Sequence, residues 1–391
     1  MKLSREDHAT VASCHAVSCP DVAATALPST AMTSNFSSVP ILEYSLIATD
    51  RTEFLAQLRH ALIHVGFLYL HGAPVDTAPI IKEAPRFFTL PQESKDALAM
   101  LNNEHFHGYT RFGTEYTRGA QDMREQIDVA TPLDKQWKVG DPDFLRLWGP
   151  SQWPTNEDLP GFKDTVEKFF VNTDALAHDF TGLVAEALGL AHKSLYDFFE
   201  PPGHMQHRGK IIKYPEVVAG QSAQGVGPHY DSGFLTFLVQ ASDHQGLQVQ
   251  TFAGEWIDVP PLPDTFVVNI GKGLEALTSG VALATCHRVV SPPAGSGTRY
   301  SVPFFQMIAQ RVNLGEAASR LQFPVDVLAE RDTRGKPVTD AVNYAEYDLY
   351  PAGQVALIGR VKSHPDVAER HYPEMFKHLF PDGLPLQISA Y

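Results

Sequence analysis

The stretch HYDSGFLTFLVQ, residues 229–240, decides the fold class that we expect for this chain of 391 residues. Its second half is rich in aromatic, β-branched and aliphatic residues, which is typical of a buried strand. Short runs of the same kind occur on both sides of it, separated by Gly, Pro, Asp and Ser. The predicted strands are 210–214, 234–240, 247–251, 255–259, 265–270, 287–290 and 299–306. Many short strands at this spacing predict a mainly β core, built as a sandwich or a barrel.

The residues before this core show the apolar spacing of helices. In the segment 51–65 the apolar side chains form one stripe, with Asp50 as a predicted N-cap and Gly66 as a predicted stop. A longer helical pattern runs from 160 to 188 and ends before Gly189. The remaining predicted elements are two short helices, 77–88 and 91–98, and a buried strand, 67–70.

The chain divides into four predicted segments. Residues 1–38 are rich in Ser, Thr and Ala without an apolar period, which predicts a flexible extension. A helical N-terminal region, 39–200, precedes the β core, 201–312. A helical tail, 313–391, follows the core and is interpreted as polar after about residue 358.

Charge and cysteine content exclude some classes of function. The chain has 31 Lys and Arg against 45 Asp and Glu, a net charge of −14, which excludes nucleic acid as the expected partner. No run of about 18 apolar residues predicts a membrane helix, and the first residues do not lead into an apolar secretory signal. The three cysteines, Cys14, Cys19 and Cys286, fit neither a zinc site nor a disulfide framework, so we expect a reducing, cytoplasmic environment.

One triplet at the start of the quoted stretch indicates metal chemistry. In a strand, residues two apart point to the same face, so His229 and Asp231 are aimed at a common point. His287 begins another predicted strand and is the candidate third ligand. Two imidazoles and one carboxylate occupy one face of an octahedron and leave three positions open, which is the pattern of non-heme Fe(II) oxygenases. A second triplet, His364-Pro365-Asp366, precedes a helical pattern and is interpreted as a helix start.

A basic residue further on indicates an anion site. Arg299 and Ser301 share one face of the predicted strand 299–306. A guanidinium next to a hydroxyl is a good receptor for a carboxylate. The alternative is an ordinary structural salt bridge of Arg299.

The motifs taken together resemble a known family. They are His229-Tyr230-Asp231-Ser232-Gly233-Phe234-Leu235-Thr236, Gly246-Leu247-Gln248-Val249, Trp256-Ile257-Asp258-Val259-Pro260-Pro261, Val267-Val268-Asn269-Ile270-Gly271, His287-Arg288-Val289-Val290 and Arg299-Tyr300-Ser301. In this order and spacing they look like the isopenicillin N synthase-like branch of the Fe(II)/2-oxoglutarate dioxygenases. The resemblance covers about residues 39 to 310. It implies a double-stranded β-helix, or jelly-roll, core flanked by helices of the N-terminal region.

The resemblance also implies roles for individual residues. It assigns Fe(II) to His229, Asp231 and His287. It assigns the co-substrate 2-oxoglutarate to Arg299, Ser301 and Tyr214. It implies an enzyme, a dioxygenase that uses O2 and 2-oxoglutarate to oxidise a small or medium organic molecule, with hydroxylation as the expected outcome and succinate and CO2 as products.

Two further positions are implied to lie near the substrate. Phe305 is in phase with Arg299 and occupies a position that often contacts the substrate in the family. Lys210 is in phase with Tyr214 and falls where relatives often carry an Arg, although a solvated lysine at the start of a strand is an equal alternative. Phe237 is a further candidate for an aromatic wall of the pocket.

One departure from the family leaves alternatives open. Ile212 stands where relatives that use 2-oxoglutarate often have Asn, which puts one contact to the co-substrate in doubt. A first alternative is an iron oxidase of the same family that does not use 2-oxoglutarate, in which Arg299 and Ser301 hold the carboxylate of the substrate. A second is a metal-free jelly-roll protein that only binds a ligand.

Overall fold

The structure is a computed structural model, and it describes residues 36–117, 120–201, 203–218, 220, 222–334 and 350–384. Most of the predicted extension 1–38, with Cys14 and Cys19, lies outside the described residues. So do 335–349 and 385–391, which belong to the predicted C-terminal tail.

Two β-sheets form the centre of the fold. The larger sheet has the order β1 (Ile41–Glu43), β2 (Phe67–His71), β12 (Thr265–Ile270), β9 (Leu235–Gln240), β14 (Arg299–Gln306), β7 (Arg208–Tyr214), β6 (Glu125–Ala130) and β3 (Gly108–Thr110). The smaller sheet has the order β11 (Trp256–Asp258), β10 (Leu247–Gln250), β13 (His287–Val290) and β8 (Gln224–His229). A separate hairpin pairs β4 (Tyr116–Thr117) with β5 (Ala120–Gln121). Strands far apart in the sequence therefore lie side by side.

The two sheets pack face to face through one buried apolar cluster. Tyr69 and Val267 of the larger sheet contribute to it, as do Leu247, Val249 and Val289 of the smaller one. Alternate residues of each strand point into this space because successive side chains of a strand point to opposite faces. The result is a jelly-roll core, and the prediction of a mainly β fold with flanking helices is confirmed.

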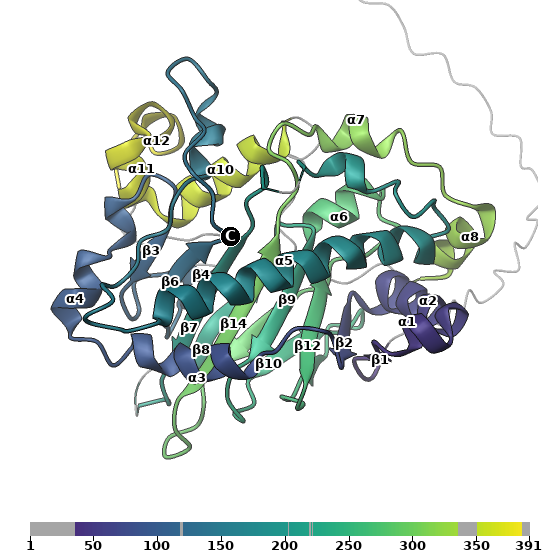
Figure 1. Cartoon of the computed structure of the whole chain (residues 1–391), viewed down its shortest axis with the longest axis horizontal. Helices are drawn as coiled ribbons and strands as arrows, with labels where there is room; N and C mark the ends of the chain where they lie inside the picture. Colours follow the sequence, from purple (N-terminus) through teal and green to yellow (C-terminus); the bar gives the residue numbers. More distant parts are fainter. Residues whose placement is uncertain are drawn as a thin grey trace, which may run out of the picture. The chain divides into compact units, whose positions relative to one another are not determined.

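Helices cover the outer face of the larger sheet. The helices before the core are α1 (Leu46–Thr49), α2 (Arg51–His60), a π-helical turn η1 (Ala61–Val65), α3 (Ala78–Phe87), α4 (Gln92–Ala97), η2 (Met100–Asn102), η3 (Asp143–Leu147), α5 (Phe162–Ala187) and η4 (Tyr196–Phe198). Figure 1 shows α5 crossing the strands of the larger sheet. Its Phe170 stacks on Phe304 of β14, with ring centres 6.0 Å apart. Burying such rings supplies much of the stability of the core.

The chain after β12 adds further helices. They are α6 (Lys272–Leu277), α7 (Leu314–Ala318), α8 (Val325–Thr333), α10 (Ala352–Ser363), α11 (Pro365–His371) and α12 (Pro373–Leu379). The last three pack into a second apolar cluster, in which Leu357, Val361 and Phe376 meet Phe106 and Trp148 of the N-terminal region. Residues after about 358 are mainly helical where they are described, as predicted, but their interpretation as a polar tail is wrong, because Val361 and Phe376 share a core with residues from much earlier in the chain. No helix in the described ranges is both long and apolar enough to cross a bilayer.

Most predicted elements are confirmed. The predicted strands 287–290 and 299–306 coincide with β13 and β14. The predicted helix 51–65 begins at an Asp50 carboxylate that accepts a hydrogen bond from the Glu53 amide at 3.1 Å, and it ends before Gly66, which has φ of 77°. Gly66 fits this turn because a Cβ there would lie 2.2 Å from the Thr285 hydroxyl oxygen. The sequence did not predict β3, β6 or β8.

Candidate metal centre

Three side chains predicted to bind iron come from two neighbouring strands of the smaller sheet. His229 is the last residue of β8 and His287 the first of β13, and the antiparallel register pairs them directly. Asp231 lies outside the strand, so the prediction that all of His229–Asp231 is extended strand is wrong. The Asp231 carbonyl oxygen instead accepts a hydrogen bond from the Lys272 amide at 2.7 Å, which fixes the turn after β8. The turn still brings the carboxylate back to the two imidazoles.

The donor atoms converge on one point. Asp231 Oδ1 lies 3.9 Å from His229 Nε2 and 3.8 Å from His287 Nε2. One donor atom of each residue lies within 4.8 Å of the other two, which is close enough for one metal ion. His229 Nδ1 donates to the Gly227 carbonyl oxygen at 2.8 Å and His287 Nδ1 to that of Thr285 at 3.2 Å. Both Nε2 lone pairs are therefore left to face the centre, as metal ligation requires.

The electrostatics of the three groups also suit a cation. Burial and the neighbouring His287 lower the pKa of His229 to about 3, so its imidazole is neutral near pH 7. Burial acts to raise the pKa of Asp231, but the two imidazoles and the hydrogen bonds from Asn269 and Thr236 together hold this pKa below its ordinary value. A neutral imidazole and an ionised carboxylate are the protonation states that bind metals. The residues present thus fit a divalent iron.

The carboxylate is oriented by two partners from the larger sheet. Asp231 Oδ2 accepts hydrogen bonds from the Thr236 hydroxyl at 2.5 Å and from Asn269 Nδ2 at 2.8 Å. Thr236 and Asn269 are themselves paired across β9 and β12, and both are buried. These bonds occupy one oxygen and leave Oδ1 directed at the imidazoles.

Replacing Asn269 with alanine is expected to weaken Fe(II) binding by about 10- to 100-fold, the usual cost of losing an outer-shell partner of a metal ligand. The change removes one of the two donors to Asp231 Oδ2 and leaves the three ligands in place. Anaerobic calorimetry with Fe(II) measures the effect. Asn172→Ala, at an exposed position of α5, is the matched control and should bind iron as the wild type does. An unchanged affinity in Asn269→Ala would show that Thr236 alone orients the carboxylate.

All eight predicted site residues line one cavity of about 290 Å³. They are His229, Asp231, His287, Arg299, Ser301, Tyr214, Phe305 and Lys210. The floor of the cavity is formed by alternate residues of β7, β14 and β9, which point to the same face of the larger sheet. Phe237 is not among the lining residues, so its prediction as a wall is wrong. It lies on the opposite face of β9, where it contacts Phe180 of α5 with ring centres 5.8 Å apart.

Arg299 is buried at one end of this cavity. Its side chain is 1% exposed, its Nη2 donates to Gln240 Oε1 at 3.1 Å, and its guanidinium carbon lies 5.0 Å from the ring centre of Tyr214. Among the described residues its Nε and Nη1 have no hydrogen-bond partner, and none of the ion pairs includes it. Nothing in the described part of the chain thus supports the alternative of a structural salt bridge. Burial lowers the pKa of Arg299, because the charged form loses its hydration.

Lys210 is not the solvated lysine that the sequence left open. Its ammonium nitrogen lies 3.5 Å from Asp128 Oδ1, and its side chain is 12% exposed. Burial lowers its pKa. Phe305, half-buried on β14, borders the same space.

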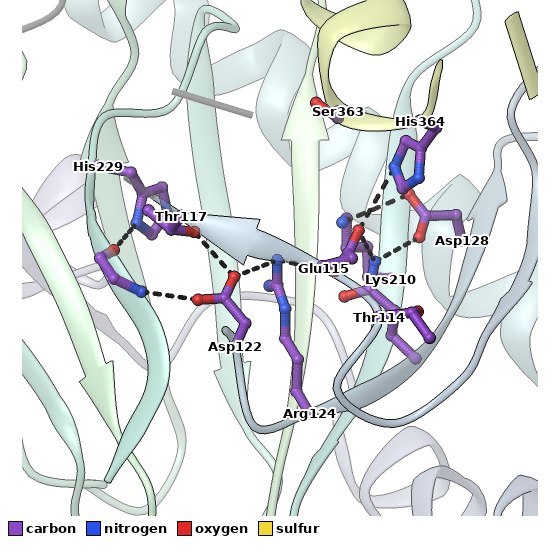
Figure 2. Close-up of polar contacts among 12 residues, drawn as sticks. Thr114, Glu115, Thr117, Asp122, Arg124, Asp128, Lys210, His229, Ser363 and His364 are labelled. Carbon is purple, nitrogen blue, oxygen red and sulfur yellow. Dashed lines mark hydrogen bonds and ion pairs between the residues drawn. The ribbon is translucent and has the colours of Figure 1, made fainter. Parts of the chain in front are cut away.

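Several charged residues of the cavity were not predicted as site residues. They are Glu115, Arg124, Arg208, Arg360, Lys362 and His364. Figure 2 shows polar contacts that lead from His229 by way of Asp122 and Arg124 to Glu115 and His364. His364 does start α11, as predicted, but its Nε2 also lies 3.4 Å from Glu115 Oε1. Only Arg208 had a signal in the sequence, since it is in phase with Lys210 and Tyr214 on one strand.

A family model described as the 2OG-Fe(II) oxygenase superfamily matches residues 204–308, and one described as non-haem dioxygenase in morphine synthesis N-terminal matches residues 39–156. The 2-oxoglutarate-dependent dioxygenase frbJ of Dothideomycetidae sp. (strain 11243) is 41% identical over 87% of this chain and 94% of its own length. Homoarginine-6-hydroxylase 2-ODD-C23 of Glycine max is 33% identical over 70% of this chain and 86% of its own.

Two solved structures are similar to the chain. A 2OG-Fe(II) oxygenase family protein of Caulobacter crescentus has a TM-score of 0.63 and 26% identity, covering 82% of this chain and 98% of that one. A full-length Neurospora crassa protein, solved in complex with alpha-KG and thymine, has a TM-score of 0.61 and 24% identity, covering 82% of this chain and 96% of that one. The second likeness concerns the fold alone.

Proposed function

This chain belongs to the 2OG-Fe(II) oxygenase superfamily and is an Fe(II)- and 2-oxoglutarate-dependent dioxygenase, and on that premise we propose that it hydroxylates a small organic molecule in the cavity beside His229, Asp231 and His287. The observation that carries the proposal is the convergence of two imidazole Nε2 atoms and one carboxylate Oδ1 within 4.8 Å of one another. These three side chains are the proposed iron ligands.

The ligand set leaves half of an octahedron for small molecules. Iron bound there would supply the activation of O2, coupled to the conversion of 2-oxoglutarate to succinate and CO2 and to the oxidation of a C–H bond. The chain itself contributes positions and protonation states. Thr236 and Asn269 orient the carboxylate of Asp231, and the backbone carbonyls behind the two imidazoles fix the tautomer that presents Nε2.

Arg299, Ser301 and Tyr214 are the proposed receptor for the distal carboxylate of 2-oxoglutarate. The guanidinium presents two nitrogens without partners among the described residues, and Ser301 lies two positions further along the same face of β14. Ile212, between Lys210 and Tyr214 on β7, adds an apolar surface where relatives often have Asn. The contact to the co-substrate then comes from iron, Arg299, Ser301 and Tyr214.

The cavity supports a small or medium substrate. Its volume of about 290 Å³ lies near the lower end of ordinary ligand pockets, which run from about 300 to 1,000 Å³. Phe305 supplies an apolar wall of the cavity and Lys210 supplies a polar wall. We assign both residues to the part of the cavity that binds the substrate. Residues of α10 line the cavity as well, so that this helix restricts the access of water to the reacting atoms. The sparse cysteines support a cytoplasmic site of action.

The test is iron-dependent turnover of the co-substrate. Purified full chain, reconstituted anaerobically with Fe(II), should bind 2-oxoglutarate by calorimetry and release succinate slowly once O2 is admitted. Succinate release should require both metal and O2, and a chelator should remove it. Hydroxylation is then assigned by screening small molecules for those that stimulate succinate release and gain one oxygen atom by mass spectrometry. Absence of iron-dependent binding of 2-oxoglutarate would contradict the proposal.

A further inference from the structure

The cavity contains a second buried guanidinium, Arg208, which the reaction described above does not use. Arg208 is the first residue of β7 and its side chain is 5% exposed. Nη2 donates to the carbonyl oxygens of His105 at 3.0 Å and Leu147 at 3.3 Å. Within the described ranges Nη1 has no hydrogen-bond partner and no carboxylate forms an ion pair with Arg208. A buried cation in this condition is costly unless an anion joins it.

Arg208 and Arg299 lie at opposite ends of the same pair of strands. The register of β7 and β14 places Arg208 opposite Phe305 and Arg299 opposite Tyr214. About six residues of strand separate the two positions, or about 20 Å at about 3.3 Å per residue. The two guanidiniums therefore face different parts of the cavity, and an anion held by Arg299 leaves Arg208 available.

Arg208 also lies at the level of the metal centre. Phe305 is paired with Arg208 on one side and with Thr236 of β9 on the other. The Thr236 hydroxyl is bonded to Asp231, one of the three proposed ligands. Two strand spacings separate Arg208 from Thr236, about 10 Å in all. A small molecule can span this interval and place one of its carbons next to the metal.

The charges around Arg208 leave a positive excess. Arg124 is paired with Glu115 and with Asp122, and the single carboxylate of Asp128 is shared by Lys210 at 3.5 Å and Arg360 at 3.2 Å. Figure 2 shows Glu115, Asp128 and Lys210 grouped apart from His229, with Asp122 and Arg124 between. The four basic side chains thus face three acidic ones, and the one without a carboxylate is Arg208.

Arg360 extends the cationic surface to the roof of the cavity. It lies on α10, its side chain is 17% exposed, and its charge contributes after burial to lowering the pKa of Arg208. Both side chains line the same cavity, so an anion bound beside them there would stabilise both positive charges. The chain has a net charge of −14, so this cluster of positive side chains is locally opposite in sign to the protein as a whole and attracts anions.

The geometry points to a second anion site, formed by Arg208 with Arg360, that binds a carboxylate of the substrate. The substrate is then an organic acid whose carboxylate lies at Arg208 and whose oxidised carbon lies at the metal. This inference rests on the proposed function, because it takes the residues beside His229 and Asp231 as the substrate side of an oxygenase.

The experiment uses hexanoate and hexanamide, which share a shape and differ in charge. Both are titrated by calorimetry into full-length protein that is saturated with Fe(II) and 2-oxoglutarate under anaerobic conditions. Hexanoate should bind at least about tenfold more tightly than hexanamide, the minimum expected from one charge-assisted hydrogen bond. In Arg208→Gln this preference should fall to less than about threefold, with the affinity for 2-oxoglutarate unchanged. Arg320→Gln, at an exposed position after α7, is the control and should keep the preference.

Each outcome of this experiment either supports or overturns the carboxylate site at Arg208. Equal binding of acid and amide by the wild type overturns the inference, and so does a preference that survives in Arg208→Gln. If Arg208→Gln does not fold, the uncharged variants Arg208→Met and Arg360→Gln take its place, and an undiminished preference in both overturns the inference equally. Failure of 2-oxoglutarate itself to bind in the same samples contradicts the proposed function instead, so the two failures are distinguishable.

Discussion

Replacing His287 with alanine is expected to reduce succinate formation to the level of metal-free protein. The variant keeps only two ligands, His229 and Asp231. It loses the His287 imidazole, which is 7% exposed in the wild type and is positioned by the register of β13 with β8. Loss of an outer-shell partner alone costs about 10- to 100-fold in metal affinity, so loss of a ligand should cost more. Iron content after anaerobic reconstitution and succinate release in air measure the two effects.

The control for this change is His378→Ala, on an exposed position of α12. It should keep the iron content and the turnover of the wild type. His364 is unsuitable as a control because its imidazole lies in the cavity beside Glu115. Full turnover in His287→Ala would mean that the metal is bound elsewhere, and a normal iron content with no turnover would make His287 a participant in the reaction other than a ligand.

The pairing of His229 with His287 shows how far the sequence alone could lead. Spacing predicted the strand that begins at His287 but not β8, which ends at His229, and it could not predict the register that places the two residues opposite each other. Register depends on contacts between strands distant in the chain and is set by the burial of one face. The resemblance of the motifs supplied the missing information. It also assigned Asp231 to the cluster that the structure forms. The separate argument from spacing, that His229 and Asp231 share one face of a strand, was wrong because β8 ends at His229.

Phe237 illustrates a different obstacle. Thr236, Phe237 and Leu238 are all apolar or small enough to be buried, and in the structure one face of β9 lines the cavity while the other packs on α5. A strand that is covered on both faces has no polar alternation to show which residues point where. The periodicity of polar and apolar residues in the sequence therefore could not assign Phe237 to the core and Thr236 to the metal centre.

The charged residues that line the cavity could not be predicted from the sequence for a third reason. Arg360 and His364 reach the cavity because α10 and α11 pack against the N-terminal region, with Leu357 and Val361 buried beside Phe106. In the sequence these helices show charged residues among apolar ones, and the triplet His364-Pro365-Asp366 indicates only a helix start. Their position is set by long-range packing, so their role became visible only when the fold was known.

Arg299→Gln is expected to raise the dissociation constant of 2-oxoglutarate by about tenfold to several hundredfold. Each hydrogen bond from a guanidinium to a carboxylate contributes about 1.5–3 kcal/mol, and about 1.4 kcal/mol corresponds to a factor of ten. The variant should fold, because no carboxylate in the described part of the chain is left unpaired when Arg299 is removed, and only Gln240 loses a bond from it. Calorimetry under anaerobic conditions measures the change, with iron content as the check that the metal centre is intact.

Arg299→Lys separates charge from shape in the same experiment. A lysine keeps the positive charge but lacks the planar fork that grips two carboxylate oxygens, so its affinity for 2-oxoglutarate should lie between those of the wild type and Arg299→Gln. Arg320→Gln, exposed and distant in sequence from the cavity residues, should leave the affinity unchanged. The informative contrary result is a normal affinity for 2-oxoglutarate together with a weakened response to the organic substrate. Arg299 would then hold the substrate, and the co-substrate carboxylate would have to be bound at the other buried guanidinium, Arg208.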